Sequence, residues 1–132
     1  MAAKKRLGES EENIQFQLAN IDRIANLTER AEAQYRKLIE QYPQRDNYKY
    51  VLGKLLIEED LDVNEGVELI DMVLARRPDN SYVNDARGWG YFKQGRYEEA
   101  LAQFRRAEDL DEGFRLPRSE MIRQVEQAMA SQ

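Results

Sequence analysis

The sequence predicts an all-α solenoid of three antiparallel helix pairs followed by a C-terminal capping helix. First, the small residues Ala31, Gly66 and Ala100 recur 35 and 34 residues apart. Second, each is followed by apolar residues after steps of 4 and then 3, which places these anchors on one helical face. Third, Pro43 and Pro78 occupy equivalent positions, where proline ends a helix. Such short helix pairs cannot bury their own apolar faces, so neighbouring pairs must stack.

A second series of anchors marks the first helix of each pair. The dipeptides at 18–19, 52–53 and 87–88 are 34 and 35 residues apart, the reverse order of the first series. This reversal locates one extra residue in the second repeat, between Gly53 and Gly66. The polar run 58–62 is the obvious place for it.

Local signals set the ends of the first four predicted helices. The first covers about 10–26 and starts at Ser10, and the second covers about 29–42 with Thr28 as its N-cap. The third covers about 46–59. The fourth covers about 63–77, after a start that resembles a capping box formed by Asp62 and Glu65.

The last three helices are predicted in the same way. The fifth covers about 80–94 and ends at Gly95, and the sixth covers about 97–111. A seventh, about 117–130, has one apolar and one polar face, as the end of a solenoid requires. The predicted domains are a flexible N-terminal tail at 1–9, repeats at 10–43, 44–78 and 79–113, and a capping helix at 114–132.

The composition argues against catalysis and against several classes of ligand. The chain contains no cysteine and no histidine, so it lacks thiolate zinc sites, a Cys nucleophile and the commonest general base. We therefore expect no enzyme, no cofactor and no metal. A net charge of −5 does not favour nucleic acid, and no segment is apolar enough for membrane insertion. The N-terminus has no apolar signal region, so we expect a cytoplasmic protein. A chain trimmed of its signal peptide would look the same, so an exported protein stays open.

The third repeat resembles the tetratricopeptide repeat. It matches the family pattern G-x2-Y-x3-G-x-Y-x2-A-L-x2-F-x2-A-x2-L from Gly88 to Leu110. The segments 64–70 and 85–89 are similar to tetratricopeptide arrays common in bacterial proteins. Three residues depart from the pattern: Arg87 replaces a usual leucine, Glu112 replaces the closing proline, and Gly90 lies inside a helix.

The resemblance implies that the first helix of each pair lines a concave groove. The residues carried over to this groove are Asn13, Phe16, Asn20, Arg23, Asn47, Tyr50, Lys54, Ile57, Tyr82, Asp85, Trp89, Phe92 and Lys93. Aromatic residues at helical spacing are also typical of a core, and this alternative holds for Phe16, Tyr82 and Phe92. Trp89 favours the groove, because Tyr91 takes the packing position two residues on. The cations fit a solvated surface equally well.

Some three-repeat members of the family bind the C-terminal EEVD tails of Hsp70 or Hsp90 through a Lys/Asn/Arg carboxylate clamp. Asn20 matches one clamp position, but the other four fall on Phe16, Val51, Tyr82 and Ala86. This pattern argues against chaperone-tail binding.

We therefore expect a protein-interaction scaffold that binds a peptide or helix of a partner in the groove, with Trp89 and Tyr50 as anchors. Lys54, Lys93 and Arg23 would favour a partner segment with acidic residues. Two alternatives remain open: a structural module that self-associates into a homo-oligomer through its end helix or convex face, and a tetratricopeptide chaperone of secreted proteins.

Overall fold

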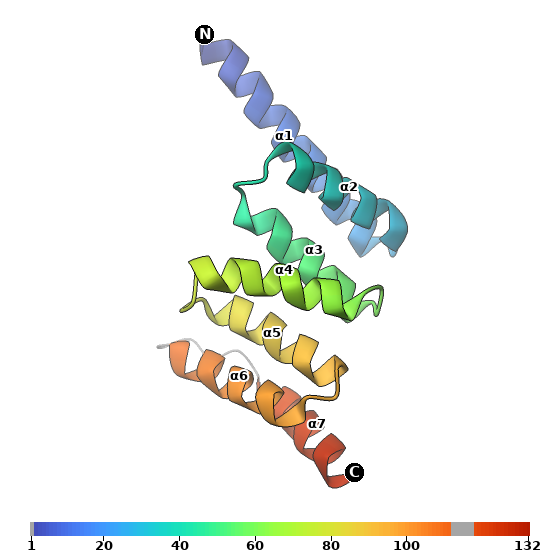
Figure 1. The fold of residues 1–132 in the computed structure, drawn as a ribbon. Coiled ribbons are helices and arrows are strands. Elements are labelled where there is room, and N and C mark those ends of the chain that lie inside the picture. Colours follow the sequence, from blue (N-terminus) through green and yellow to red (C-terminus); the bar gives the residue numbers. More distant parts are fainter. Residues whose placement is uncertain (1, 112–117) are drawn as a thin grey trace. The chain divides into compact units, whose positions relative to one another are not determined.

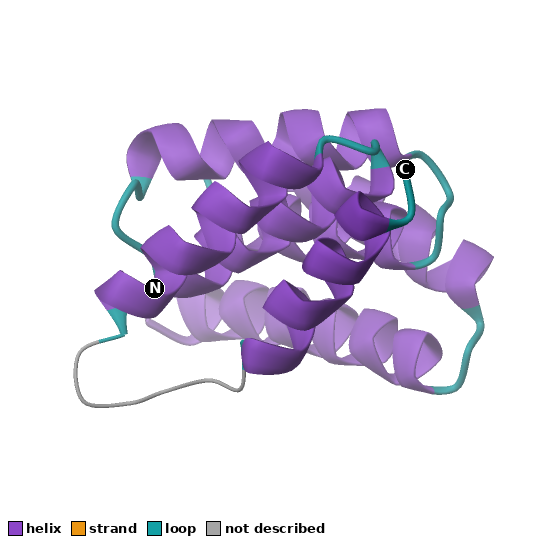
Figure 2. Cartoon of the chain, turned by 90° about the horizontal axis from the view of Figure 1, so that it is seen from below, coloured by secondary structure: helices purple, strands orange, loops and turns teal. Residues whose placement is uncertain are grey.

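The computed structural model describes residues 2–111 and 118–132, with side chains from residue 11 onward. All regular secondary structure in these residues is α-helical (Figures 1 and 2), which confirms the all-α prediction. The helices are α1 (Ala2–Ile24), α2 (Thr28–Gln41), α3 (Asp46–Glu58), α4 (Val63–Arg76), α5 (Ser81–Lys93), α6 (Tyr97–Leu110) and α7 (Ser119–Ala130).

The chain forms two compact units, and the division falls within α3, between Leu52 and Gly53. In the first unit α1 packs against α2. In the second unit α5 packs against both α4 and α6, and α6 also packs against α7. The connections at 25–27 and 94–96 have three residues, and the connection at 59–62 has four.

The core of the first unit is built on the small and aromatic anchors. Ala19 of α1 and Ala31, Tyr35 and Leu38 of α2 are all fully buried. Their 4- and 3-residue steps bring them to the inner side of α2, where the small residues let the two helices approach closely.

The second unit depends on glycines at helix crossings. A Cβ atom on Gly66 of α4 would lie 2.7 Å from the carbonyl oxygen of Gly53 in α3. A Cβ on Gly90 of α5 would lie 2.5 Å from Cγ2 of Val67 in α4. Gly90, which is unfavourable for an isolated helix, is therefore required for the close contact between α4 and α5.

Most of the helix ends follow the local signals. The Asp62 side chain accepts a hydrogen bond of 3.0 Å from the Glu65 amide, which confirms the predicted cap of α4. Asn80 caps α5 in the same way by accepting from the Val83 amide at 3.1 Å. Gly95 follows α5 with a φ of 78°, a conformation that glycine adopts without a steric penalty.

Two predicted helix starts differ from the structure. Helix α1 begins at Ala2 instead of Ser10, so the predicted tail at 1–9 is largely helical. The reason lies in the sequence, because Ala, Lys, Arg and Leu at 2–7 are strong helix formers. Thr28 is the first residue of α2 and not its cap; the cap position is Leu27, which makes no side-chain cap bond. The position of Glu112 and the predicted start of the seventh helix at 117 lie outside the described residues.

Candidate partner-binding surface

A pocket opens in the second unit between the C-terminal part of α3 and the C-terminal half of α5. It has a volume of about 290 Å³ and is lined by Ile57, Glu58, Trp89 and Lys93. Three of these residues belong to the predicted groove set. Ile57 is only 1% exposed, so it is a core residue whose side chain contributes to the pocket wall. The pocket therefore combines an apolar wall with one acidic and one basic residue.

Trp89 is half-buried and held by aromatic neighbours. Its ring meets the ring of Phe92 edge-on at a centroid distance of 5.6 Å and that of Phe104 at 5.8 Å. Phe92 is also half-buried and packs against Tyr97 at 5.6 Å. Edge-to-face contacts of this kind fix the orientation of a ring. Trp89 therefore packs against aromatic residues and also lines an open pocket.

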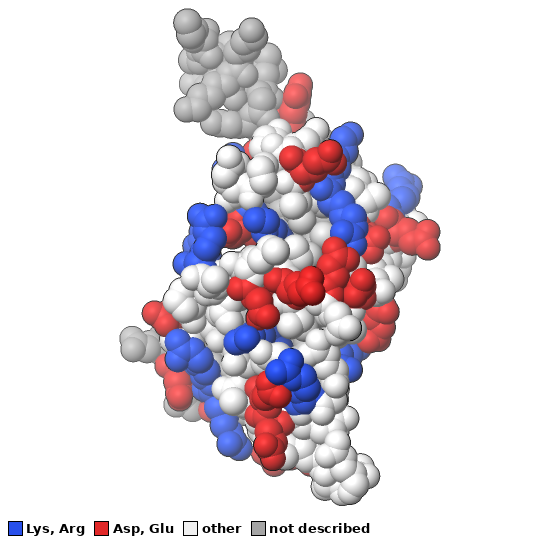
Figure 3. Space-filling view, viewed as in Figure 1, with Lys and Arg blue, Asp and Glu red and all other residues white. Residues whose placement is uncertain are grey.

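The two lysines near this pocket are paired with acids. The Lys93 ammonium lies 3.0 Å from the Asp60 carboxylate, and that of Lys54 lies 3.7 Å from Glu58. An acidic neighbour therefore balances the charge of each lysine. On the molecular face shown in Figure 3, acidic and basic side chains lie interspersed rather than segregated.

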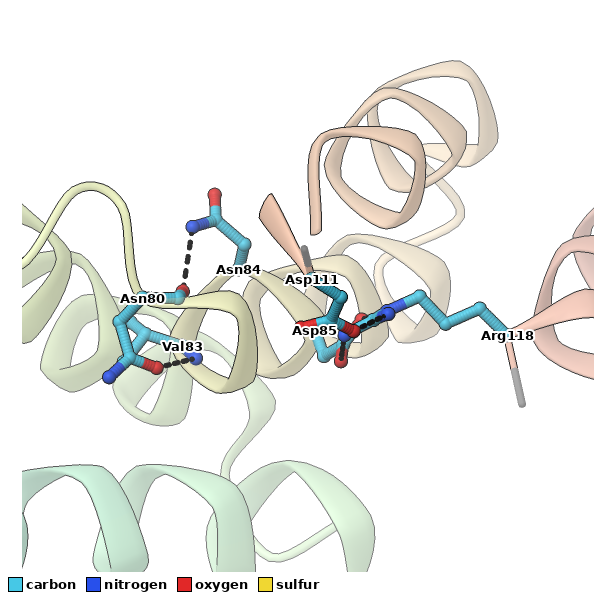
Figure 4. A network of polar contacts seen from close by, with 6 residues as sticks. All are labelled: Asn80, Val83, Asn84, Asp85, Asp111 and Arg118. Carbon is cyan, nitrogen blue, oxygen red and sulfur yellow. Dashed lines mark hydrogen bonds and ion pairs between the residues drawn. The ribbon is translucent and has the colours of Figure 1, made fainter. Parts of the chain in front are cut away.

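Asp85 does not line an open surface, contrary to the expectation from the sequence. It is 8% exposed, and its two carboxylate oxygens accept hydrogen bonds of 2.6 and 2.7 Å from the guanidinium of Arg118 (Figure 4). Arg118 is 1% exposed and also donates to Asp111 at the end of α6. Burial raises the pKa of the Asp85 carboxyl, and the Arg118 guanidinium opposes this shift. This cluster connects α5, the end of α6 and the residue before α7.

Arg118 was missed by the sequence reasoning. It stands 33 residues from Asp85 and belongs to no recurring pattern, so only the opposite charge of the two residues could have suggested the pair.

The first unit contains a second, more polar pocket of about 230 Å³, lined by Glu12, Asn13, Arg45 and Tyr48. The Glu12 carboxylate accepts hydrogen bonds from Arg45 at 3.0 Å and from the Tyr48 hydroxyl at 2.7 Å. Burial and the bond to Glu12 raise the pKa of Tyr48. Since Glu12 is engaged from both sides, this pocket offers a ligand chiefly the exposed amide of Asn13.

Three predicted groove residues of α1 contact core tyrosines. Phe16 is half-buried and packs against Tyr48 at 5.2 Å and Tyr35 at 6.3 Å. The Tyr35 hydroxyl donates to Asn20 and accepts a bond of 3.4 Å from Arg23. These contacts support the packing alternative for Phe16 and assign Asn20 and Arg23 to a local polar network.

The remaining predicted residues differ in exposure. Asn47 is exposed and Tyr50 is half-buried in α3, and Tyr82 is 53% exposed on α5. None of the three lines the pocket at Trp89. Among the predicted residues of the second unit, the structure therefore brings Ile57, Trp89 and Lys93 together, with Phe92 supporting Trp89.

In the part of the chain that the structure describes, no helix has the length and apolar character needed to cross a bilayer. The same residues contain no cluster of three or more acidic, His or Cys side chains suited to a metal ion.

Comparison with known proteins gave one family match. The model of the tetratricopeptide repeat family matches residues 81–114, a range that includes α5 and α6. No curated protein matches the chain.

Several solved structures share the fold. The first tetratricopeptide repeat domain of Spaghetti (RPAP3), bound to the HSP90 peptide SRMEEVD, is 15% identical, with coverage of 92% of this chain and 94% of that one and a TM-score of 0.78. The corresponding domain of Sgt2 from Aspergillus fumigatus is 11% identical, with coverage of 92% and 80% and a TM-score of 0.78. A mutant form of MamA is 27% identical, with coverage of 78% and 74% and a TM-score of 0.68.

Proposed function

We propose that this chain, which has the tetratricopeptide fold and matches the family model at residues 81–114, is a non-catalytic interaction scaffold. Its α3–α5 pocket would bind an apolar side chain of a partner peptide. The observation that carries the proposal is the half-buried Trp89 ring, which is oriented by Phe92 and Phe104 and still lines a pocket. A preorganised aromatic side chain in a partly desolvated pocket is typical of an interaction hot spot.

The structural neighbours support peptide binding in general but not the same ligand. The RPAP3 domain has the same fold and carries an HSP90 peptide. In the present chain, clamp positions implied by the family resemblance are occupied by Phe16 and Tyr82, which cannot supply ammonium or guanidinium groups. We therefore do not propose an EEVD tail as the ligand.

The charges around the pocket favour an apolar contact over an acidic one. Lys93 and Lys54 are each paired with an acid, so an acidic peptide would have to compete with Asp60 and Glu58. Burial of an apolar side chain needs no such exchange and contributes about 25 cal/mol per Å² of area removed from water. The partner segment is therefore one with a large apolar side chain and without a requirement for acidic residues.

The single tryptophan of the sequence provides a direct assay. Peptides would be selected from a displayed random library on the intact chain and titrated while Trp89 emission is recorded. We expect the selected peptides to share a large apolar residue, to shift the emission, and to lose at least tenfold in affinity when that residue becomes alanine.

Variants of the chain test whether the pocket is the binding site. Trp89→Ala should weaken the same peptides at least tenfold by calorimetry, and Trp89→Phe, which keeps most of the packing, should weaken them less. Tyr82→Ala is the matched control, because Tyr82 lies on the same helix but outside the pocket. Unchanged binding by a folded Trp89→Ala protein would refute the proposal.

A further inference from the structure

Helix α1 carries an exposed row of large apolar side chains. Ile14, Leu18 and Ile21 are 55%, 51% and 58% exposed, and Ile24 at the end of the helix is 72% exposed. Steps of 4 and 3 place the first three on one face of the helix. We call Ile14, Leu18 and Ile21, with the adjoining Ile24, the α1 apolar face. It lies opposite to the side that carries the buried Ala19.

Residues at the positions equivalent to the α1 apolar face are buried in the second repeat. Leu18 corresponds to Leu52 in the second repeat and to Arg87 in the third, and the same register pairs Ile21 with Leu55 and Gly90. Leu52 and Leu55 are 1% and 3% exposed.

Contacts in the third repeat identify the type of element that covers the equivalent positions. In the second unit, Arg87 forms an ion pair of 2.7 Å with Asp71 of α4, and Gly90 lies against Val67 of the same helix. The face of α5 that is equivalent to the α1 apolar face is therefore covered by a packed helix.

The charge pattern permits a second copy of the same helix as the partner. Residues 13–21 contain no charged side chain, although 34% of the whole sequence is charged. A two-fold interface places the same surface on both sides, so a surface with charges of one sign would repel its own copy. The α1 apolar face carries no charged side chain. Ile14 stands four residues before Leu18 and Ile21 three residues after it. Two antiparallel copies that cross at Leu18 would therefore bring Ile14 of each near Ile21 of the other.

A second copy of the chain also offers a matching surface. Apart from the α1 apolar face and the adjacent Leu27, the large hydrophobic side chains found exposed in the described residues are Leu61, Met72 and Tyr82, which lie on three separate elements. No second apolar row of this kind is formed by them. We propose that the α1 apolar face is a self-association surface, on which α1 of a second copy packs in antiparallel orientation.

The antiparallel orientation follows from Glu11, which lies on the same side of the helix as Ile14 and Leu18. In a parallel pair the two Glu11 carboxylates would approach each other, whereas in an antiparallel pair each lies near Ala25 of the other copy. A contact formed mainly by one helix from each copy is small, so we expect a reversible dimer with a dissociation constant on the order of 100 μM.

Sedimentation equilibrium over a wide concentration range tests the proposal on the intact chain. We expect a monomer–dimer equilibrium that Leu18→Glu weakens at least tenfold. Met72→Glu is the matched control, because Met72 is 55% exposed but lies on α4, and it should leave the equilibrium unchanged. Trp89→Ala should also leave it unchanged, so the dimer and the peptide pocket can fail independently.

Disulfide trapping gives a second readout that does not depend on the folding of Leu18→Glu. The sequence has no cysteine, so Leu18→Cys introduces a single thiol next to the proposed two-fold axis. Under mild oxidation it should form a covalent dimer several-fold faster than Met72→Cys. A monomer at all concentrations would overturn the proposal. A dimer unaffected by Leu18→Glu, or equal cross-linking of the two cysteine variants, would overturn it as well.

Discussion

Arg118→Ala is expected to destabilise the protein strongly, because it leaves the Asp85 carboxylate buried without its cation. Arg118 and Asp85 are 1% and 8% exposed, and the guanidinium donates to both carboxylate oxygens at 2.6 and 2.7 Å. Removing one partner of a buried ion pair costs about 3–5 kcal/mol. For a chain of 132 residues the unfolding entropy is about 280 cal/mol/K, so the melting temperature should fall by about 11–18 °C if the chain unfolds cooperatively.

The matched control is an exposed ion pair between neighbouring helices. Arg105 of α6 lies 3.9 Å from Glu126 of α7, and the two side chains are 64% and 56% exposed. Solvent screens such a pair, so Arg105→Ala should cost about 0.2–1 kcal/mol and lower the melting temperature by about 1–4 °C. Thermal unfolding followed by circular dichroism compares the two variants. A loss for Arg118→Ala no larger than that for Arg105→Ala would refute the reasoning.

The pH dependence gives a second check on the same variant. Burial raises the pKa of Asp85 in the folded state, and the loss of the opposing Arg118 guanidinium leaves that shift uncompensated. The folded Arg118→Ala protein therefore favours the neutral carboxyl, and the penalty of burying the charge is present at neutral pH. It should be relieved as the pH falls through the folded-state pKa, so the difference from the wild-type protein should narrow on acidification.

Two further outcomes are expected. Gly90→Ala should destabilise the protein by about 1–3 kcal/mol despite the better helix propensity of alanine, because the alanine Cβ would lie 2.5 Å from Val67. Urea unfolding measures this loss of stability. A gain in stability would contradict the close contact between α4 and α5. Tyr48 has a raised folded-state pKa, so its stabilising effect is complete below the ordinary tyrosine pKa of about 10 and is lost at higher pH. Tyr48→Phe should therefore reduce the loss of stability in alkali, and equal losses in both proteins would argue against the bond to Glu12.

The fold was predictable because its determinants are local and repeated. Steps of 4 and 3 between Ala31, Tyr35 and Leu38 describe a helix face that is fully buried in the structure. Asp62 caps the start of α4 and Gly95 follows the end of α5, and both signals act within a few residues, so they are visible in the sequence.

The candidate site was only partly predictable, because its electrostatics depend on side chains far apart in the chain. Lys93 could be placed on α5 from the repeat pattern, but its pairing with Asp60 depends on the α3–α4 connection. Arg87, a departure from the family pattern, forms an ion pair with Asp71 and lies 5.0 Å from the Tyr91 ring centre. Long-range pairs of this kind follow from tertiary packing and leave no periodic signal.

The Asp85–Arg118 pair also has a consequence for anyone who lengthens or recombines this protein. A designed module inserted between α6 and α7 would separate Arg118 from Asp85 and leave the Asp85 carboxylate on α5 without its cation. Its first helix would have to carry an arginine that reaches Asp85, or Asp85 would have to be exchanged for an uncharged residue. Conversely, α7 grafted onto an unrelated array would bring a cation that needs a matching acid in the host.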